Sequence, residues 1–241
     1  MLKPASFHPR MQLKIHSFPT LAQNVHFDDV LFQLAQKTGA GECVRFWESP
    51  QYGIVLGRIG KEEDDIDLEA AVKDGIPVIR RSSGGGTVLQ GPGCLNYALI
   101  LSKQKHPVLN DLRGSYQWIS QKIIDVLKIQ GIEALFCPIS DIALASNQKK
   151  FSGNAQRRAK DYILHHGTIL YNFDLPRIAQ YLKLPKDMPN YRNARSHLDF
   201  VSNIYINPSQ FQRSMAQAFE APDTAQPLTP QELSSLEKYN I

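Results

Sequence analysis

A run of glycines behind basic and hydroxyl side chains is the strongest chemical feature of the sequence. It reads Arg80-Arg81-Ser82-Ser83-Gly84-Gly85-Gly86-Thr87 and follows a predicted strand. Consecutive glycines allow a close backbone approach, and their free N–H groups can surround a carboxylate or phosphate, to which an arginine adds a charged fork. The motif lacks both the Gly-Lys-Ser/Thr of a Walker A loop and the GxGxxG of a dinucleotide fingerprint. We expect either an anion-binding loop or a plain flexible hairpin loop.

A basic segment at residues 149–160 is the second candidate. Strand alternation would divide its side chains between two faces, with Lys150, Ser152 and Asn154 on one and Phe151 and Gly153 on the other. A lysine ammonium that points into a cleft can stabilise the negative charge developing on a phosphate or acyl oxygen. The alternative is a solvated edge strand whose lysines discourage aggregation.

Two histidines and a cysteine complete the set of reactive side chains. His165 and His166 are neighbours in a predicted strand, so they face opposite sides and only one can reach a given site. For one of them we expect a buried, hydrogen-bonded role. Cys137 could accept an acyl group as a thioester, although a small buried side chain at a strand end is commoner. The three cysteines form no CxxC pair, which favours a reducing compartment and no metal site.

The elements that must position these residues mix helices and strands without strict alternation. Apolar spacing and end signals predict helices at 24–39, 66–73, 111–130, 175–182 and 208–219, and a last short helix after the capping box of Thr229 and Glu232. Strands are predicted at 43–47, 52–57, 78–81, 95–101, 132–136, 141–145, 151–156 and 162–173. This pattern predicts an α+β fold with a mixed, largely antiparallel sheet flanked by helices.

Some finer expectations follow from the same signals. The strands at 43–47 and 52–57 are expected to pair as a hairpin, because Ser49-Pro50-Gln51 between them is typical of a turn. Asp28 and Asp29 are expected in the first turn of the first helix, where the helix dipole favours acids. Asp174 and Asn207 are expected to cap two later helices.

Length and composition exclude several classes of protein. The 241 residues are 42% hydrophobic and 21% charged, which is typical of a folded globular chain and not of a disordered one. The balance of 27 Lys and Arg against 23 Asp and Glu gives a net charge of +4, which argues against a nucleic-acid partner but is compatible with anionic ligands. No stretch approaches the roughly 18 apolar residues of a membrane helix, and the N-terminus lacks the apolar run of a secretory signal. We expect a cytoplasmic protein, or an organellar one with a transit peptide, and no membrane partner.

Four motifs, in this order, resemble the lipoate-protein ligase A family of the biotin and lipoate protein ligase superfamily. They are residues 80–88 (RRSSGGGTV), 140–142 (SDI), 150–156 (KFSGNAQ) and 165–170 (HHGTIL). The resemblance implies a catalytic domain over residues 1–220, followed by a short C-terminal tail with a helix at 221–241. It also implies an enzyme that activates lipoate or octanoate with ATP to an acyl-adenylate and transfers the acyl group to a lysine of a lipoyl-carrier protein.

The same resemblance implies roles for individual residues. Lys150 would be the catalytic group that contacts the acyl and α-phosphate oxygens. The substrate-binding residues would be Arg81, Ser83, Gly84, Gly85, Gly86, Thr87, Asp141, Ser152, Gly153, His166 and Thr168. Mg²⁺ would enter as the ATP complex. The partner would be the lipoyl-carrier domain of a 2-oxoacid dehydrogenase or of a glycine cleavage protein, which a basic rim of Arg157, Arg158 and Lys160 would suit.

Three departures from the family pattern leave the reaction open. Gln90 stands where family members commonly have a histidine, and only residues 221–241 follow the catalytic domain, so a separate accessory polypeptide could be needed. Related octanoyltransferases use a cysteine shortly before the lysine motif, and Cys137 lies in that neighbourhood. The alternatives are therefore an octanoyl or lipoyl transferase with a thioester on Cys137, and a non-catalytic binder of lipoate or an adenylate. A biotin ligase is a weaker alternative.

Overall fold

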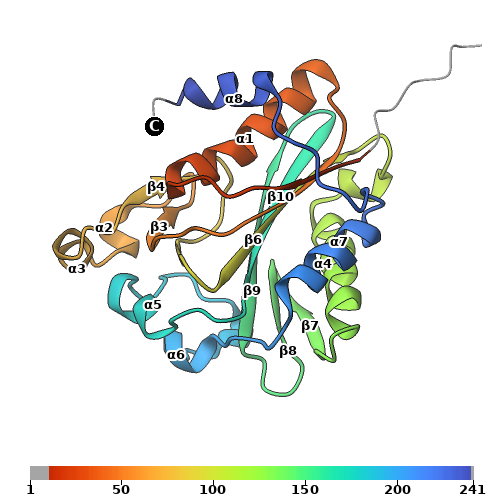
Figure 1. Cartoon of the computed structure of the whole chain (residues 1–241). Helices are drawn as coiled ribbons and strands as arrows, with labels where there is room; N and C mark the ends of the chain where they lie inside the picture. The colour runs from red at the N-terminus through yellow and green to blue at the C-terminus, as the bar shows by residue number, and fades with distance from the viewer. Residues whose placement is uncertain (1–10, 240–241) are drawn as a thin grey trace, which may run out of the picture.

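The computed structural model describes residues 11–239, which form a seven-stranded and a three-stranded sheet with helices packed around them (Figure 1). Helices and strands occur in mixed order, and all strand pairs of the large sheet are antiparallel except one. The predicted α+β class is confirmed.

The large sheet carries most of the motif residues. Its strands lie in the order β1 (Gln12–Ile15), β2 (Cys43–Trp47), β6 (Cys94–Ser102), β10 (Tyr162–Leu170), β9 (Lys150–Arg158), β8 (Asp141–Leu144) and β7 (Ala134–Cys137). β1 is parallel to β2. The long central strands β6 and β10 are almost entirely buried.

The small sheet holds the ends of the glycine run. It consists of β4 (Val78–Arg80), β3 (Gly53–Leu56) and β5 (Val88–Gln90), with β3 in the middle. The predicted hairpin of residues 43–47 and 52–57 is wrong: β2 inserts between β1 and β6, whereas β3 pairs with β4 and β5. The turn signal between the two strands marks the place where the chain passes from one sheet to the other.

Helices cover both faces of the large sheet. α1 (Leu21–Thr38) packs on one face, and α4 (Leu112–Lys128) and α7 (Pro208–Ala218) pack on the other (Figure 1). The remaining helices are α2 (Glu62–Asp65), α3 (Leu68–Lys73), α5 (Pro176–Tyr181), α6 (His197–Phe200) and α8 (Pro230–Glu237), with 3₁₀ turns at Pro107–Asn110 and Asn190–Arg192. Each large apolar side chain buried in these contacts contributes about 1.5 to 3 kcal/mol relative to exposure.

Helix ends agree with the sequence in some places and differ in others. Asn207 and Thr229 cap α7 and α8 as predicted. Asp174 does not cap α5, which begins after Leu175. α1 begins at a capping box formed by Thr20 and Gln23, so it starts earlier than predicted, and its acidic residues lie in its interior and not in its first turn.

Residues 221–239 pack onto the first elements of the chain. Lys14 of β1 forms an ion pair with Glu232 of α8 at 3.0 Å, and both side chains are buried. The Lys14 ammonium also donates to the carbonyl of Pro227 at 2.8 Å. Leu236 of α8 joins the apolar cluster between α1 and the sheet. Residues 1–10 of the predicted catalytic domain and residues 240–241 of the predicted C-terminal tail lie outside the described residues.

Candidate active site

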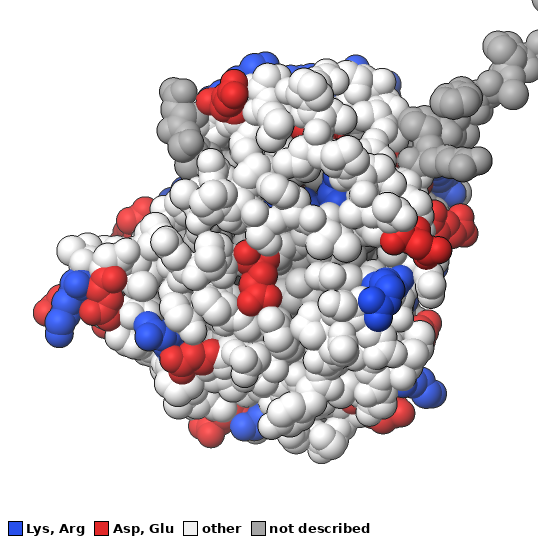
Figure 2. Space-filling view, viewed as in Figure 1, with Lys and Arg blue, Asp and Glu red and all other residues white. Residues whose placement is uncertain are grey.

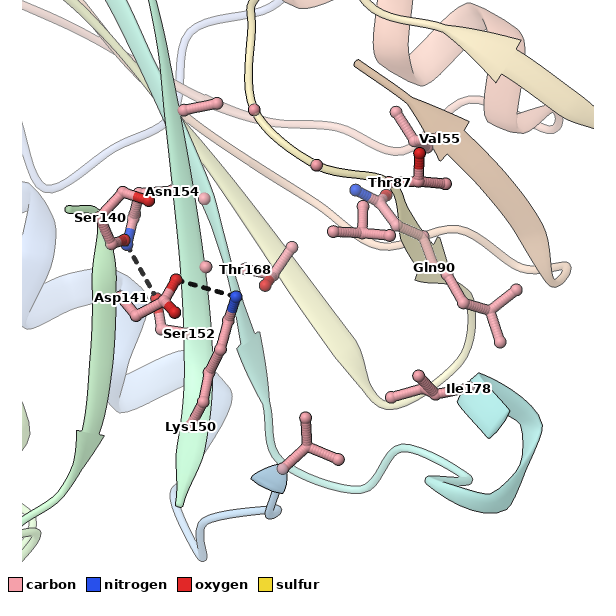
Figure 3. A pocket seen from close by; sticks show the side chains of 18 of the residues that line it. Val55, Thr87, Gln90, Ser140, Asp141, Lys150, Ser152, Asn154, Thr168 and Ile178 are labelled. Atoms are coloured by element: carbon pink, nitrogen blue, oxygen red, sulfur yellow. Dashed lines mark hydrogen bonds and ion pairs between the residues drawn. The ribbon is translucent and has the colours of Figure 1, made fainter. Parts of the chain in front are cut away.

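A cavity of about 510 Å³ lies between the two sheets, beside the segment 183–201. It brings together ten of the predicted site residues: Arg81, Gly85, Gly86, Thr87, Asp141, Lys150, Ser152, Gly153, His166 and Thr168. Figure 3 shows Lys150 and Asp141 on one side of the cavity, and Thr87 and Gln90 of the small-sheet region on the other. Ser83 is one layer behind this wall, where it is 1% exposed.

The glycine loop, residues 82–87, is folded around the side chain of Arg81. The guanidinium donates to the Ser83 hydroxyl (3.0 Å) and to the carbonyls of Val55 (3.2 Å), Gly84 (2.7 Å) and Gly86 (2.8 Å). Burial lowers the pKa of Arg81 to about 10, so it remains charged at neutral pH. Because oxygens of the protein take four of the five guanidinium N–H groups, one is left for an anion in this conformation, and the substrate-binding role of Arg81 stays a prediction. The Arg81 side chain holds the glycine loop in its folded shape.

Two glycines give the loop its shape. Gly85 has φ +88°, a left-handed conformation that glycine adopts without steric cost. At Gly57, which follows β3, an added Cβ would overlap the carbonyl oxygen of Gly85. Gly57 therefore permits the close approach of the loop to the small sheet.

Two consecutive aspartates of α1 anchor two consecutive serines of the loop. Asp29 accepts from the Ser82 hydroxyl and, at 2.9 Å, from Arg157 Nη1. Asp28 acts through His166, whose Nδ1 lies 3.4 Å from Asp28 Oδ2 and whose Nε2 lies 2.6 Å from Ser83 Oγ. Both carboxylates are buried. The predicted helix-dipole role of these acids is therefore wrong, since they position the loop.

The charge of Asp28 is balanced in the interior. Its Oδ1 lies 2.5 Å from Nη1 of Arg45, a fully buried side chain that also donates to the backbone and side-chain oxygens of Asn24. Removing one partner from such a pair leaves an uncompensated buried charge, which costs about 3 to 5 kcal/mol. The anchor of the loop is thus tied to the core between α1 and β2.

A β-bulge decides where Lys150 points. Ile142 of β8 faces Ser152 and Ala143 faces Lys150, so Phe151 has no partner in β8. As a result Lys150 lies beside Gly153, where an added Cβ would be 2.8 Å from Lys150 Nζ. The predicted grouping of Lys150 with Ser152 and Asn154 is wrong. The latter two form a separate buried network, in which Asn154 Nδ2 lies 3.3 Å from Ser152 Oγ and Asn154 Oδ1 accepts from Tyr97.

The Asp141 carboxylate contacts both Lys150 and Tyr191. Lys150 Nζ lies 2.8 Å from Asp141 Oδ1, across the strands β9 and β8 (Figure 3). Tyr191 donates its hydroxyl to Asp141 Oδ2 at 2.6 Å, and burial together with the Asp141 charge raises the pKa of Tyr191. Lys150 also bridges to Val201, which fixes the end of the segment 183–201 beside the ammonium. The Lys150 ammonium therefore faces the cavity while the Asp141 carboxylate balances its charge.

The two histidines divide as predicted. His166 faces the cavity, whereas His165 is fully buried on the other face of the sheet, within 3.1 Å of both Asn154 Oδ1 and Gln156 Nε2. Burial lowers the pKa of His165 to about 3, so it is neutral at physiological pH. His165 is the predicted structural histidine.

The cysteines are buried. Cys137 is 4% exposed at the end of β7, and burial, reinforced by the Asp141 charge, raises its pKa to about 11. A nucleophilic thiol needs a lowered pKa and access to the substrate. The geometry therefore gives no support to a thioester on Cys137. Burial also raises the pKa of Cys94.

Two members of the predicted basic rim are committed to internal contacts. Arg157 pairs with Asp29, and Arg158 donates to the side chains of Gln156 (2.7 Å) and Ser115 (3.0 Å) and to the carbonyl of Leu109. Lys160 is exposed. On the face shown in Figure 2, charged side chains are scattered and most of the surface is uncharged. The basic docking rim therefore stays a prediction, with its two arginines partly exposed and also held by internal contacts.

Several functional residues escaped the sequence analysis. Asp28, Asp29 and Tyr191 hold the motif residues in place, and Asp65 accepts from the Thr87 hydroxyl at 2.7 Å. A signal existed for the aspartates, since the capping box at Thr20 places them in the helix interior beside apolar residues. Nothing local marks Tyr191, which comes from a segment with little regular structure.

Within residues 11–239, no three His, Cys, Asp or Glu side chains are grouped so that they could hold a metal ion, and no helix there has the length and apolar character to cross a membrane.

The chain belongs to the lipoyl protein ligase A/B catalytic domain family, whose model matches residues 20–220. It is 31% identical over 145 residues to a probable lipoate-protein ligase A of Mycoplasma pneumoniae, covering 60% of this chain and 41% of that protein. It is 27% identical over 229 residues to the octanoyltransferase LipM of Anoxybacillus flavithermus, covering 83% and 81%. The first curated relatives are longer, and the chain spans 41% to 56% of their length.

Solved structures share the fold. A bipartite lipoate protein ligase from Thermoplasma acidophilum, studied with its E2 lipoyl domain, superposes with a TM-score of 0.82 at 21% identity. The superposition covers 96% of this chain and 92% of the Thermoplasma chain. A lipoate-protein ligase A bound with ATP gives a TM-score of 0.75 at 21% identity, with 96% and 94% covered. The family thus includes both ligases and octanoyltransferases, built on this fold.

Proposed function

We propose that the chain is an ATP-dependent lipoate-protein ligase. It activates lipoate or octanoate to an acyl-adenylate and transfers the acyl group to a lysine of a lipoyl-carrier protein. The observation that carries the proposal is the position of Lys150, whose ammonium enters the cavity and is held 2.8 Å from Asp141. A fixed positive charge of this kind stabilises the negative charge that develops on acyl and phosphate oxygens.

The cavity walls suit the two halves of such a substrate. Val25, Trp47, Val55 and Val88 form an apolar cluster that lines one part of the cavity, where an aliphatic tail would be buried. The backbone of Gly85 and Gly86, in the glycine loop that lines the cavity beside this cluster, suits a phosphate. ATP would enter as its Mg²⁺ complex, as substrate, and the ATP-bound relative of the same fold supports this assignment.

Two chemical steps follow. A carboxylate oxygen of the fatty acid attacks the α-phosphorus of ATP, and pyrophosphate leaves with the electrons of the broken P–O bond. The lysine amine of the carrier then attacks the acyl carbon, the C–O bond to the phosphate breaks, and AMP leaves while the amine proton passes to solvent. Lys150 neutralises charge in both steps, and the buried cavity keeps water from the reactive anhydride.

The test is to incubate the purified protein with lipoate, ATP, Mg²⁺ and a lipoyl domain of a 2-oxoacid dehydrogenase, and separately with a glycine cleavage carrier protein. We expect release of AMP and a mass increase of one lipoyl group on the carrier. The Thermoplasma relative, described together with its E2 lipoyl domain, supports this choice of carrier. If no AMP is released and the carrier is not modified, the proposal is contradicted.

A second candidate is an ATP-independent octanoyltransferase, favoured by the similarity to LipM over 81% of that protein. It is tested by supplying octanoyl carrier protein without ATP and measuring the intact mass of the lipoyl domain for an added octanoyl group. A Cys137→Ser variant separates the routes, because a thioester mechanism requires the thiol. The buried, weakly acidic thiol of Cys137 leads us to expect that this variant keeps its activity.

A further inference from the structure

Gln90 carries a buried polar group that the described residues leave without a partner. It is the last residue of β5 and is 6% exposed, yet it lines the cavity. Its Oε1 atom is buried and has no hydrogen-bond partner among residues 11–239. An unsatisfied buried acceptor costs about 1 to 3 kcal/mol, so the site gains if a ligand supplies a donor there.

The register of the small sheet sets the direction of this side chain. Val55 of β3 faces Val88 of β5, and Gln90 is two residues beyond Val88, so all three lie on one face of the sheet. Val55 and Val88 belong to the apolar cluster that lines the cavity. Figure 3 shows Gln90 on the opposite side of the cavity from Lys150. A substrate between the two sheets would have Lys150 on one side and Gln90 on the other.

The amide of Asn154, in the sheet that carries Lys150, is by contrast satisfied by the protein. Its oxygen accepts from Tyr97, and its nitrogen donates to the carbonyl of Ser140 at 2.8 Å. Gln90 Oε1 has no comparable contact among the described residues. Other buried polar atoms, such as Gln36 Nε2 and Ser120 Oγ, also lack partners within residues 11–239, but these two residues do not line the cavity, whereas Gln90 does.

The chemistry at the acyl carbon limits what that ligand group can be. The carbonyl and phosphate oxygens of an acyl-adenylate only accept hydrogen bonds, so they do not satisfy Oε1. Of the groups that meet at the acyl carbon, only the attacking amine carries N–H donors. Resting on the proposed function, we propose that Gln90 Oε1 accepts an N–H of the incoming carrier lysine and aims the nitrogen lone pair at the acyl carbon.

Gln90 takes no proton in this step. The nitrogen lone pair forms the C–N bond, the bond from carbon to the phosphate oxygen breaks, AMP leaves with that electron pair, and the amine proton goes to solvent. The hydrogen bond orients the nucleophile before attack. Gln90 therefore acts on acyl transfer and not on adenylate formation.

The experiment measures the two half-reactions separately in Gln90→Met, with the exposed Gln121→Met of α4 as control. Adenylate formation is followed as pyrophosphate release with lipoate and ATP. Transfer is followed by intact mass of a lipoyl domain after mixing with chemically prepared lipoyl-adenylate. We expect Gln90→Met to slow transfer about 10-fold, while adenylate formation and the control variant stay within about two-fold of the unmodified protein.

A conservative variant provides a readout that a merely structural role would not move. Gln90→His offers an acceptor nitrogen while its imidazole is neutral. Transfer should therefore recover at pH 8 and fall again as the pH drops through about 6.5, the ordinary imidazole pKa. The unmodified protein, which has an amide at this position, should not show this added decline.

The outcomes distinguish this inference from the proposed function. If no pyrophosphate is released, yet transfer from the supplied adenylate depends on Gln90, the ligase proposal fails and this inference stands. Unchanged transfer in Gln90→Met overturns it. So does a raised KM for ATP with normal transfer, since the amide then binds the nucleotide, and so does a lack of transfer from the supplied adenylate in the unmodified protein.

Discussion

The Nε2 atom of His166 lies 2.6 Å from the Oγ atom of Ser83, although the two residues are 83 positions apart in the sequence. On its other side the ring meets Asp28, whose carboxylate can only accept a hydrogen bond. Nδ1 is therefore the atom that donates to Asp28, while Nε2 meets the Ser83 hydroxyl. The imidazole thus links the glycine loop to α1.

Lys150→Ala should abolish most of the catalysis. Removing a fixed donor to a developing oxyanion slows reactions by about 100- to 1000-fold, and we expect that loss in pyrophosphate release. The neighbouring Lys149, which donates to the carbonyl of Leu198 at 3.4 Å, provides the control. Equal losses in Lys149→Ala and Lys150→Ala would show that general positive charge, and not the position beside Asp141, is what matters.

Asp29→Ala should weaken substrate binding. The substitution removes the acceptor of both Ser82 and Arg157, so the glycine loop loses one of its two anchors on α1. A lost hydrogen bond of this kind is worth about 1 kcal/mol, which corresponds to a several-fold rise in the Kd for lipoate by calorimetry. Asp125→Ala on the exposed side of α4 is the matched control. Unchanged lipoate affinity in Asp29→Ala would contradict the anchoring role.

Gly57→Ala should lower the free energy of unfolding by about 1 to 3 kcal/mol, because the new methyl group meets the Gly85 carbonyl and backbone must shift. Gly84→Ala, where the added group meets nothing within 4 Å, should stay within about 0.5 kcal/mol. Urea denaturation of the two variants side by side measures the difference. Equal stabilities would mean that the loop does not pack against Gly57.

His165 should make the fold sensitive to acid. Its pKa is lowered from 6.5 to about 3 by burial, so between these values the unfolded chain binds a proton that the folded chain does not. Its contribution to stability is therefore full above pH 6.5 and is lost as the pH falls from there toward 3. Two pH units in this range are worth about 2.7 kcal/mol.

The check is the change in the free energy of unfolding between pH 7 and pH 4.5, compared for the unmodified protein and His165→Gln. Other groups titrate equally in both proteins, so the difference isolates His165. We expect the variant to be less stable at pH 7 but to lose less on acidification. Parallel pH profiles would show that His165 is protonated in the folded state.

The spacing of apolar residues predicted the fold class because it reflects which side chains are buried. In α4 the apolar face is buried and the polar face is exposed. Strand pairing was less predictable. Ser49-Pro50-Gln51 announces a turn, but whether the strands on either side pair depends on distant segments, here β1 and β6. Local sequence does not contain that information.

The site shows the same division. The resemblance carried by the four ordered motifs implied a shared site for Lys150, Asp141 and His166, and all three line one cavity. Alternation failed at Phe151, since a bulge inserts one residue without any local signal. The loop-side role of Arg81 was missed because its partners are backbone carbonyls, which every sequence supplies.

The buried pair of Lys14 and Glu232 also orders events in time. The two residues are 218 positions apart, so during synthesis β1 leaves the ribosome long before its partner exists. Until α8 arrives, burying the Lys14 ammonium means burying a lone cation, which is strongly unfavourable. Lys14 of β1 therefore cannot reach its buried, paired position before residues 227–232 have been made.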